Sequence, residues 1–369
     1  MRASGIARRI PCEGAAALEE VTRACFVSGA VGREGLLIGA LPFDRDGEVV
    51  LVQPEQVKWG SGRDWADPVA TPSGIGIRTL TECPPASVYA DRVRRALQAM
   101  AVAPEGALRK VVLARALRIE ADAPVDPLVI AARLAADTSV TTFLADLSAD
   151  GAGSGTLVGA TPELLLSRQG RKVLSHPLAG SARRHADGVE DRRAAESLLA
   201  SEKDRREHAL VVEAILDLLA PYCARLGTPD GTGLRSTATM WHLGTRIEGA
   251  LKSDDAPSVA GLAALLHPTP AVGGYPRDAA LERIRELEPE GRGYYAGALG
   301  WVDARGDGEW HVTLRCATVE GNSLVLHAGA GIVPGSDPEA EVAETAAKFR
   351  AMVLALGVDE RDAVLEKVA

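Results

Sequence analysis

The order of apolar and polar positions predicts short strands that pair with their neighbours along the chain. Over 35–58, two apolar runs flank a turn at 44–47, which predicts a β-hairpin. Residues 109–119 predict a strand because two β-branched residues lead a short and persistently apolar run. Over 297–331, apolar runs separated by two glycine-containing turns predict a meander of three strands. These patterns indicate antiparallel pairing.

Segments with helical spacing lie between these hairpins, and they do not alternate regularly with single strands. A further strand is predicted at 139–146, and a hairpin over 155–175 with its turn at 169–170. A Pro-, Gly- and Ser-rich loop is expected at 60–85, as a linker or a surface excursion. Helices are predicted at 87–100, 126–136, 190–225, 256–266, 277–287 and 338–356. This order favours an α+β fold over a doubly wound parallel sheet.

Composition narrows the class of partner. The 369 residues carry a net charge of -9 without a block of Lys and Arg, which argues against sequence-independent binding of nucleic acid. Five scattered cysteines without a CxxC pair suit reduced thiols rather than a disulfide framework or a zinc site. Neither a signal peptide nor a membrane-spanning run is recognisable. We therefore expect a cytoplasmic protein with a small-molecule partner.

The segment SEKDRREHALVVEAILDLLA (201–220) opens with charges and then becomes apolar. Ser201 and Asp204 have the spacing of a capping box, which accounts for part of that charge. At about 100° per residue, Glu207 falls near the middle of the apolar stripe, whereas the neighbouring charges fall elsewhere. A buried carboxylate needs a cation, hydrogen bonds or protonation. The pattern leaves two interpretations equally open, an exposed residue at a helix start and a functional carboxylate.

The helix predicted at 338–356 carries a second set of charges. Glu341, Glu344 and Lys348 share one face, opposite an apolar face that contains Phe349 and Val353. One interpretation is a solvated stripe with a pair between Glu344 and Lys348. The other is a hard cation held by carboxylates from two helices, because Mg²⁺ prefers oxygen ligands and binds one or two carboxylates plus a substrate.

Several other segments and residues carry weaker signals. HPLAGSARR (176–184) and HAGAGIVPGS (327–336) place small residues where backbone amides can approach an anion, without the spacing of a P-loop or a dinucleotide fingerprint. Singly, a lysine or arginine in a strand usually snorkels to water or forms a salt bridge. Four polar residues in suggestive places favour a functional site together: Lys110, Glu163, His242 and Arg315.

Taken in order, the segments resemble the chorismate-utilising enzymes, and most closely the isochorismate synthases of the siderophore type. The likeness covers about 100–356 and is faint before residue 100. The segments that carry it are KVVLAR (110–115), GATPELLL (159–166), PLAGSARR (177–184), SEKDRREH (201–208), TATMWHLGTRIEG (237–249), LHPTPAVGGYP (266–276), GEWHVTLRCA (308–317) and AGAGIVPGSDPEAEVAET (328–345).

The resemblance implies a fold and a reaction. The fold is a single large α+β domain over 1–369, with two packed antiparallel sheets and helices outside, in which 1–100 is the divergent part and 101–356 carries the motifs. The reaction is the Mg²⁺-dependent conversion of chorismate to isochorismate, in which water adds at C2 and the C4 hydroxyl leaves. An acid and a base on opposite faces of the ring lower this barrier together.

The resemblance also implies roles for single residues. Lys110 matches the general base on water, and a lysine can take that role only where its site favours the neutral amine. Glu163 matches the acid that protonates the departing hydroxyl. Glu207 and Glu344 match Mg²⁺ ligands, with Glu341 and Asp204 as water-mediated or outer-shell partners. The residues that match substrate-binding positions are Gly180, Ser181, His242, Ala271, Arg315, Gly329 and Lys348.

Departures from related enzymes limit the alternatives. Anthranilate and aminodeoxychorismate synthases carry a PIAGTRPRG-like segment where this chain has PLAGSARR, so no glutaminase subunit is expected. Salicylate synthases have a hydroxyl-bearing residue near Ala271, so we expect the reaction to stop at isochorismate. The alternatives are a salicylate synthase that goes on to eliminate pyruvate and a non-catalytic homologue that binds chorismate. We expect a monomer that binds neither nucleic acid nor membrane, in a siderophore or menaquinone pathway.

Overall fold

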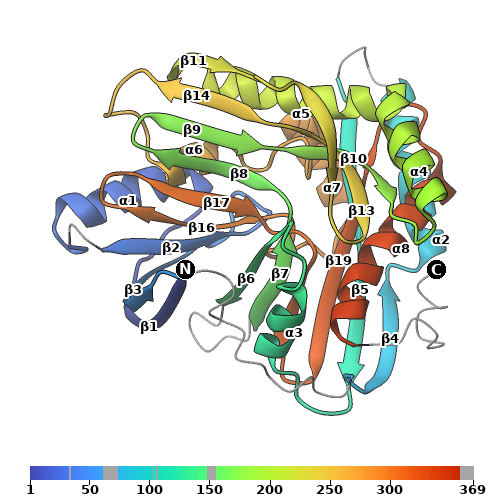
Figure 1. Cartoon of the computed structure of the whole chain (residues 1–369), viewed down its shortest axis with the longest axis horizontal. Coiled ribbons are helices and arrows are strands. Elements are labelled where there is room, and N and C mark those ends of the chain that lie inside the picture. The colour runs from blue at the N-terminus through green and yellow to red at the C-terminus, as the bar shows by residue number, and fades with distance from the viewer. Residues whose placement is uncertain (33–34, 61–73, 103, 105–106, 148–154, 358–369) are drawn as a thin grey trace.

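The predicted strands assemble into two large antiparallel sheets and one small one in the computed structural model (Figure 1). The structure describes residues 1–32, 35–60, 74–102, 104, 107–147 and 155–357. The nine-stranded sheet has the order β1 (Arg2–Arg9), β3 (Val50–Lys58), β2 (Leu36–Leu41), β16 (Ala298–Asp303), β17 (Gly308–Val312), β8 (Leu164–Gln169), β9 (Lys172–His176), β14 (Ile247–Leu251) and β11 (Cys223–Gly227). Strands from the first sixty residues thus complete a sheet with strands from beyond residue 160.

The second large sheet carries the long central strands of the molecule. Its order is β15 (Gly274–Tyr275), β5 (Lys110–Ala121), β19 (Ser323–Ile332), β18 (Cys316–Glu320), β7 (Thr156–Thr161) and β6 (Thr141–Asp146), and β4 (Ile77–Cys83) also pairs with β5. The small sheet has the order β10 (Leu178–Arg183), β13 (Met240–Thr245) and β12 (Thr232–Ser236). β5 and β19 run antiparallel from the pair Glu120 and Ser323 to the pair Val111 and Ile332, so Lys110 lies just beyond this ladder.

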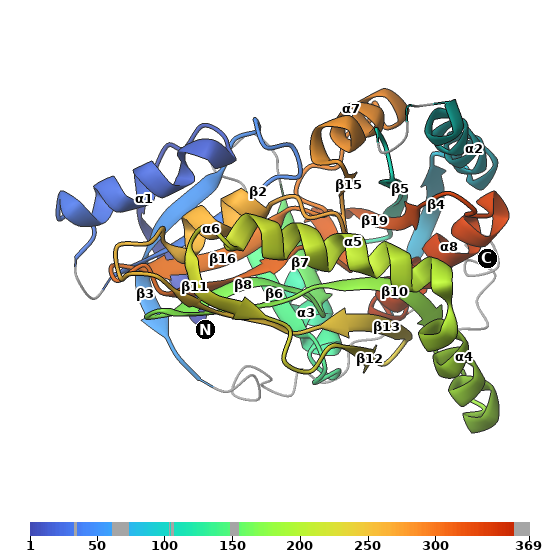
Figure 2. The same cartoon turned by 90° about the horizontal axis from the view of Figure 1, so that it is seen from above.

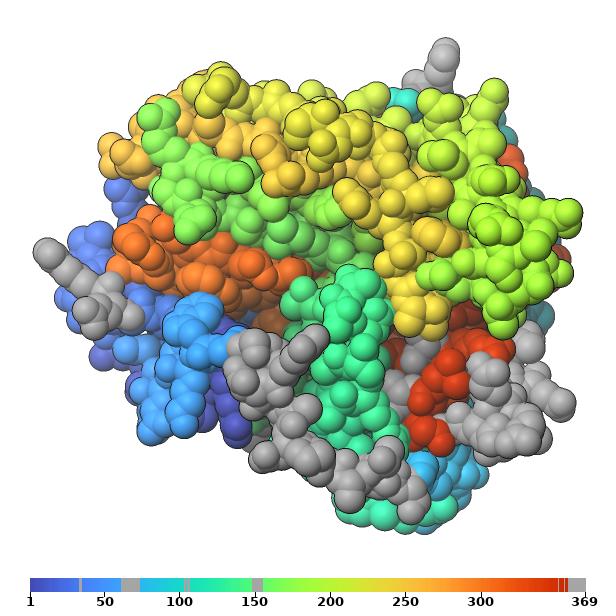
Figure 3. Space-filling view, viewed as in Figure 1, coloured from blue at the N-terminus to red at the C-terminus, as the bar shows by residue number. Residues whose placement is uncertain are grey.

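The helices cover the sheets from outside (Figure 2). They are η1 (Ala15–Ala17), α1 (Leu18–Val27), α2 (Ala86–Val102), α3 (Pro127–Leu134), α4 (Gly188–Ala200), α5 (Glu202–Leu219), α6 (Val259–Leu266), α7 (Arg277–Leu287) and α8 (Pro338–Ala355). α6 packs on strands of the nine-stranded sheet, α5 packs on β10 and β13, and α2, α7 and α8 gather at β5 and β19. In the space-filling view, α3 lies between the strands β16 and β17 and the helix α8 (Figure 3).

Apolar burial holds α8 in place against the second sheet. Phe349 and Val353 are buried in a cluster with Leu117 of β5 and Leu326 of β19. Because these apolar residues recur at helical spacing on one face of α8, their burial turns the other face toward β10. That second face carries the charges predicted to be functional.

The α+β architecture and most predicted elements are confirmed. α7 has the predicted bounds, α5 begins with Ser201 as its N-cap, and the hairpins β2–β3 and β8–β9 pair as expected. Sequence patterns did not predict β1, η1, α1, β4, β15 or the strands from β10 to β14. Among the described helices, none combines the length and apolar character that a membrane span requires.

Three predictions need correction. The single helix expected over 190–225 is two helices, α4 and α5, because Ser201 has an extended backbone and caps α5, and the chain enters β11 at Cys223. The loop expected over 60–85 contains the strand β4, which adds to the edge of β5, while 61–73 lie outside the described residues. The middle strand expected in the meander is two strands, β17 and β18, which belong to different sheets. Arg315 lies between them with a left-handed φ of 47° and therefore not inside a strand as predicted, because an extended strand cannot pass through that conformation.

A buried ion pair joins the end of α7 to the second sheet. Glu288 and Arg292 lie 2.7 Å apart, and both are nearly inaccessible to water. Glu288 accepts from the amide of Ala114 at 2.7 Å, while Arg292 donates to the carbonyls of Val112 at 2.7 Å and Val272 at 2.8 Å. The pair therefore fixes the loop at 266–276 against β5.

We predict that Glu288→Ala lowers the free energy of unfolding by about 3–5 kcal/mol, because it leaves the Arg292 guanidinium buried without its carboxylate. Urea denaturation followed by circular dichroism measures this change. Glu286→Ala, which removes an exposed partner of Arg283, is the matched control and should cost less than about 1 kcal/mol. Equal losses in the two variants would contradict the structural role of the buried pair.

Candidate active site

One pocket, where β10 and β13 face β19 and α8, gathers most of the residues singled out in the sequence. It is formed by segments far apart in the chain, so only the fold brings them together. The predicted residues that line it are Glu163, Gly180, Ser181, Glu207, His242, Ala271, Arg315, Gly329, Glu344 and Lys348. Lys110 lies behind this lining in contact with Glu207, and Glu341 lies behind it in contact with Lys203.

Lys110, the first residue of β5, is 0% exposed and forms an ion pair with Glu207 of α5 at 2.9 Å. The interatomic angles leave Nζ without a hydrogen bond to any group in the described part of the chain. Its donors therefore remain available to a water or substrate. Glu207 is 7% exposed, which confirms that it faces inward.

Gly331 of β19 leaves the space that this ion pair occupies. A Cβ built on Gly331 would lie 2.1 Å from Oε1 of Glu207 and 3.1 Å from Cε of Lys110. Any larger residue would push the carboxylate out of its position. Sequence patterns placed Gly331 in a small-residue segment but did not identify it as a site residue.

Glu163 sits between β7 and β8 and is 2% exposed. Its amide donates to Oγ1 of Thr161 at 3.2 Å, and its carbonyl accepts from the amide of Val312 at 3.2 Å, so the backbone is fixed. Burial raises the pKa of the carboxyl to about 8, and the charges of Lys110 and Lys348 only partly oppose that rise. At neutral pH this group holds a proton that it can donate.

Arg315 and His242 form a cationic wall of the pocket. The left-handed backbone at Arg315 turns its side chain toward β13, where Nη2 lies 2.6 Å from Nε2 of His242. Burial, together with the charges of Arg315 and Lys348, holds the pKa of His242 well below its usual range. The imidazole is therefore neutral and can accept from the guanidinium, whose own pKa burial lowers to about 10.

The inner face of α8 carries two lysine–glutamate contacts. Lys348 lies 2.7 Å from Glu344 and donates to the carbonyl of Gly329 at 2.8 Å, while Ser181 donates to Glu344 at 2.8 Å. Glu341 is 1% exposed and pairs with Lys203 at 2.9 Å. Burial and the neighbouring Glu344 raise the pKa of Glu341. These charges therefore face the protein and the pocket and do not form a solvated stripe.

The carboxylates of this pocket suit a hard cation in kind and in place. Glu207 and Glu344 reach the pocket from two helices, and Mg²⁺ commonly uses one or two carboxylates while its other ligands are water and substrate. Within the described residues, no three His, Cys, Asp or Glu side chains are grouped closely enough to enclose a metal. The donor set fits a cation shared with a substrate and not one enclosed by protein.

Several residues that line the pocket were not singled out in the sequence. Among them are Arg292, Tyr295, His327 and Gly331. Tyr295 and His327 stack with ring centroids 5.1 Å apart. A glutamate and an arginine four residues apart, directly after the helix predicted at 277–287, are the one local signal for Arg292.

Comparison with known proteins assigns the family. The family model described as chorismate binding enzyme matches residues 67–357. The chain therefore belongs to the chorismate-binding enzyme family, with the chorismate-utilising fold expected from the sequence.

Within this family, the chain is similar to isochorismate synthases. It is 44% identical to isochorismate synthase DhbC of Bacillus subtilis over 88% of this chain and 81% of that protein. It is 41% identical to isochorismate synthase EntC of Escherichia coli, again over 88% and 81% of the two chains. The structure of DhbC from Bacillus anthracis superposes with a TM-score of 0.88 at 40% identity, covering 97% of this chain and 93% of that one.

We predict that Glu163 is protonated at neutral pH and loses its proton as the pH rises through about 8, since its pKa is raised from 4.5 to that value. Infrared difference spectra of the protonated carboxyl band, recorded between pH 5 and pH 10, measure this transition. Glu163→Gln should remove the band, whereas Glu320→Gln, at an exposed strand end, should leave it. A transition near pH 4.5 would contradict the burial effect.

Proposed function

We propose that this protein is a Mg²⁺-dependent isochorismate synthase that converts chorismate to isochorismate. The observation that carries the proposal is the buried acid Glu163, with its pKa raised to about 8, in the same pocket as the buried ion pair of Lys110 and Glu207. Chorismate chemistry needs both a proton donor for the departing C4 hydroxyl and a group that takes a proton from water at C2.

In this proposal the side chains act on opposite faces of the substrate ring. Glu163 donates its proton to the C4 hydroxyl, which leaves as water. Lys110 holds a neutral amine in the substrate complex and takes a proton from the water that adds at C2, and the ammonium so formed is stabilised by Glu207 at 2.9 Å. Proton exchange with the solvent then returns a proton to Glu163 and removes one from Lys110. Burial of the reacting groups strengthens these electrostatic effects.

Cations and backbone groups of the pocket orient the substrate in the proposal. Arg315 and Lys348 bind carboxylates of chorismate, while Gly180, Ser181 and Gly329 present backbone or hydroxyl groups. Glu207 and Glu344 would hold Mg²⁺, with Glu341 and Asp204 farther out. When bound, the metal would neutralise the ring carboxylate of chorismate. The neutral His242 positions the Arg315 guanidinium at 2.6 Å.

The proposal includes a cellular setting. The isochorismate would feed siderophore biosynthesis through 2,3-dihydroxybenzoate or salicylate, with menaquinone as the other destination. The protein would act in the cytoplasm as a monomer, without a glutaminase subunit and without binding nucleic acid. Its residues 1–369 would form one domain, which the pairing of β2 with β16 across the chain supports.

The chorismate assay tests the reaction. Purified protein with chorismate and Mg²⁺ should yield isochorismate in equilibrium with chorismate, as measured by chromatography. Lys110→Ala and Glu163→Gln should each lower kcat by about 10²–10⁴-fold, since each removes one proton transfer. The exposed residues Lys172 and Glu320 supply the controls Lys172→Ala and Glu320→Gln, which should retain wild-type turnover.

Other outcomes of the chorismate assay would assign a different function. Salicylate and pyruvate would assign the salicylate synthase activity, although Ala271 lines the pocket without a hydroxyl. Chorismate binding without turnover, measured by calorimetry, would indicate the non-catalytic homologue. Full activity of Lys110→Ala or Glu163→Gln, with unchanged circular dichroism, would remove that residue's role.

Calorimetric titration with Mg²⁺ in the presence of chorismate tests the metal ligands without relying on turnover. Glu207→Gln and Glu344→Gln should each weaken Mg²⁺ binding by at least about tenfold, because each removes an anionic oxygen ligand. Glu341→Gln should have a smaller effect, and Glu339→Gln, on the exposed start of α8, should have none. Unchanged binding in the first two variants would place the metal elsewhere.

A further inference from the structure

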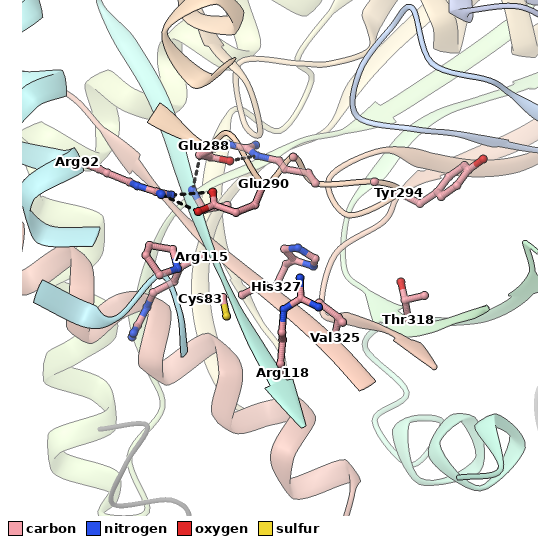
Figure 4. Close-up of a pocket in the computed structure, with 16 residues that line it drawn as sticks. Cys83, Arg92, Arg115, Arg118, Glu288, Glu290, Tyr294, Thr318, Val325 and His327 are labelled. Atoms are coloured by element: carbon pink, nitrogen blue, oxygen red, sulfur yellow. Dashed lines mark hydrogen bonds and ion pairs between the residues drawn. The ribbon is translucent and has the colours of Figure 1, made fainter. Parts of the chain in front are cut away.

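A second cavity lies behind the wall of the catalytic pocket. It has a volume of about 330 Å³ and is bounded by α2, β5, β18, β19 and the segment 288–294 (Figure 4). Arg292 and His327 line both cavities, so a single layer of side chains separates them. None of the residues predicted from the sequence as catalytic, substrate-binding or metal-binding lines this second cavity.

Four arginines line the second cavity, and three of them are neutralised by a carboxylate. Arg92 donates to both carboxylate oxygens of Glu290, at 2.9 and 3.2 Å. Arg292 pairs with Glu288 at 2.7 Å. Arg115 pairs with Glu82 at 2.6 Å. The fourth arginine, Arg118, therefore carries the positive charge that this set of residues leaves over.

The guanidinium of Arg118 is available to a ligand. Its side chain is exposed at the cavity and, within the described part of the chain, has no hydrogen bond or ion pair. Figure 4 shows it extending from β5 toward the ring of His327 in the middle of the cavity. Thr318 of β18 also lines the cavity, and its hydroxyl makes no hydrogen bond to the described residues. A cation and a neutral donor thus face the same space.

The rest of the cavity lining suits an organic ligand with an apolar part and not an inorganic ion. Pro84, Tyr294 and Val325 also line the cavity. Burial and the charges of Arg292 and Arg118 lower the pKa of His327 to about 4, so its ring is neutral at physiological pH. A planar guanidinium matches a carboxylate in two parallel hydrogen bonds. An inorganic phosphate would leave the apolar surface uncovered.

We propose that this cavity is a second ligand site, distinct from the catalytic pocket, that binds a small carboxylate attached to an apolar ring. Arg118 is the ion-pair partner of the carboxylate, Thr318 donates a further hydrogen bond, and the ring lies against Pro84 and Val325. The site stands on its own geometry and does not depend on the reaction catalysed next to it.

Benzoate is the probe for this site, and calorimetry measures its binding to the full chain. Binding should persist in Arg315→Gln, because that variant removes a cation that lines only the other pocket. Arg118→Gln should weaken benzoate binding by at least about tenfold, since it removes a charge-assisted contact. Arg78→Gln, which removes an exposed arginine of the neighbouring strand β4, is the matched control and should not change it.

Benzamide and inorganic phosphate test which part of benzoate the cavity recognises. Benzamide, which keeps the ring and loses the charge, should bind at least about tenfold more weakly, and inorganic phosphate should not displace benzoate. Equal benzoate binding by wild type and Arg118→Gln would overturn the proposal. So would loss of benzoate binding in Arg315→Gln, which would place the benzoate in the catalytic pocket.

Discussion

A lysine side chain that is wholly removed from water needs a polar or charged partner beside it, and this requirement organises the centre of the molecule. Lys110, at 0% exposure, depends on Glu207 at 2.9 Å, because an unpaired charge in the interior costs several kcal/mol. The contact holds α5 against the start of β5. It also excludes any side chain at Gly331, whose Cβ would overlap the Glu207 carboxylate. This one electrostatic constraint thus fixes the position of α5 against β5 and requires glycine at position 331.

Around this centre, the fold gives buried carboxyl groups different protonation states. Glu163 has no carboxylate-binding donor strong enough to offset its burial, so it stays protonated to about pH 8. Glu344, by contrast, is close to Lys348 and Ser181, and these contacts lower its pKa despite burial. Two carboxyl groups of one pocket therefore take opposite states at neutral pH. A protonated acid and an anion therefore line the same pocket.

Local sequence patterns predicted much of this arrangement. They did not predict features that depend on residues far apart in the sequence. Helical periodicity predicted α7 within its observed bounds and the inward orientation of Glu207. The break at Arg315 could not be predicted, because the preference for a left-handed residue arises from two sheets meeting there. Lys203 and Glu341 pair across 138 positions, and nothing near either residue indicates the other. The family resemblance, not periodicity, pointed to Lys110 and Glu163 as partners.

In the proposed reaction, external water enters the substrate at C2 while the C4 hydroxyl leaves, and a base and an acid of one pocket carry the two proton transfers. Conversion of chorismate in oxygen-18 water, stopped early and analysed by mass spectrometry and nuclear magnetic resonance, tests this reaction. The account predicts isochorismate with the heavy oxygen at C2. Isochorismate formed at the same rate without the label would mean that the hydroxyl migrates within the substrate, and would contradict the roles given to Lys110 and Glu163.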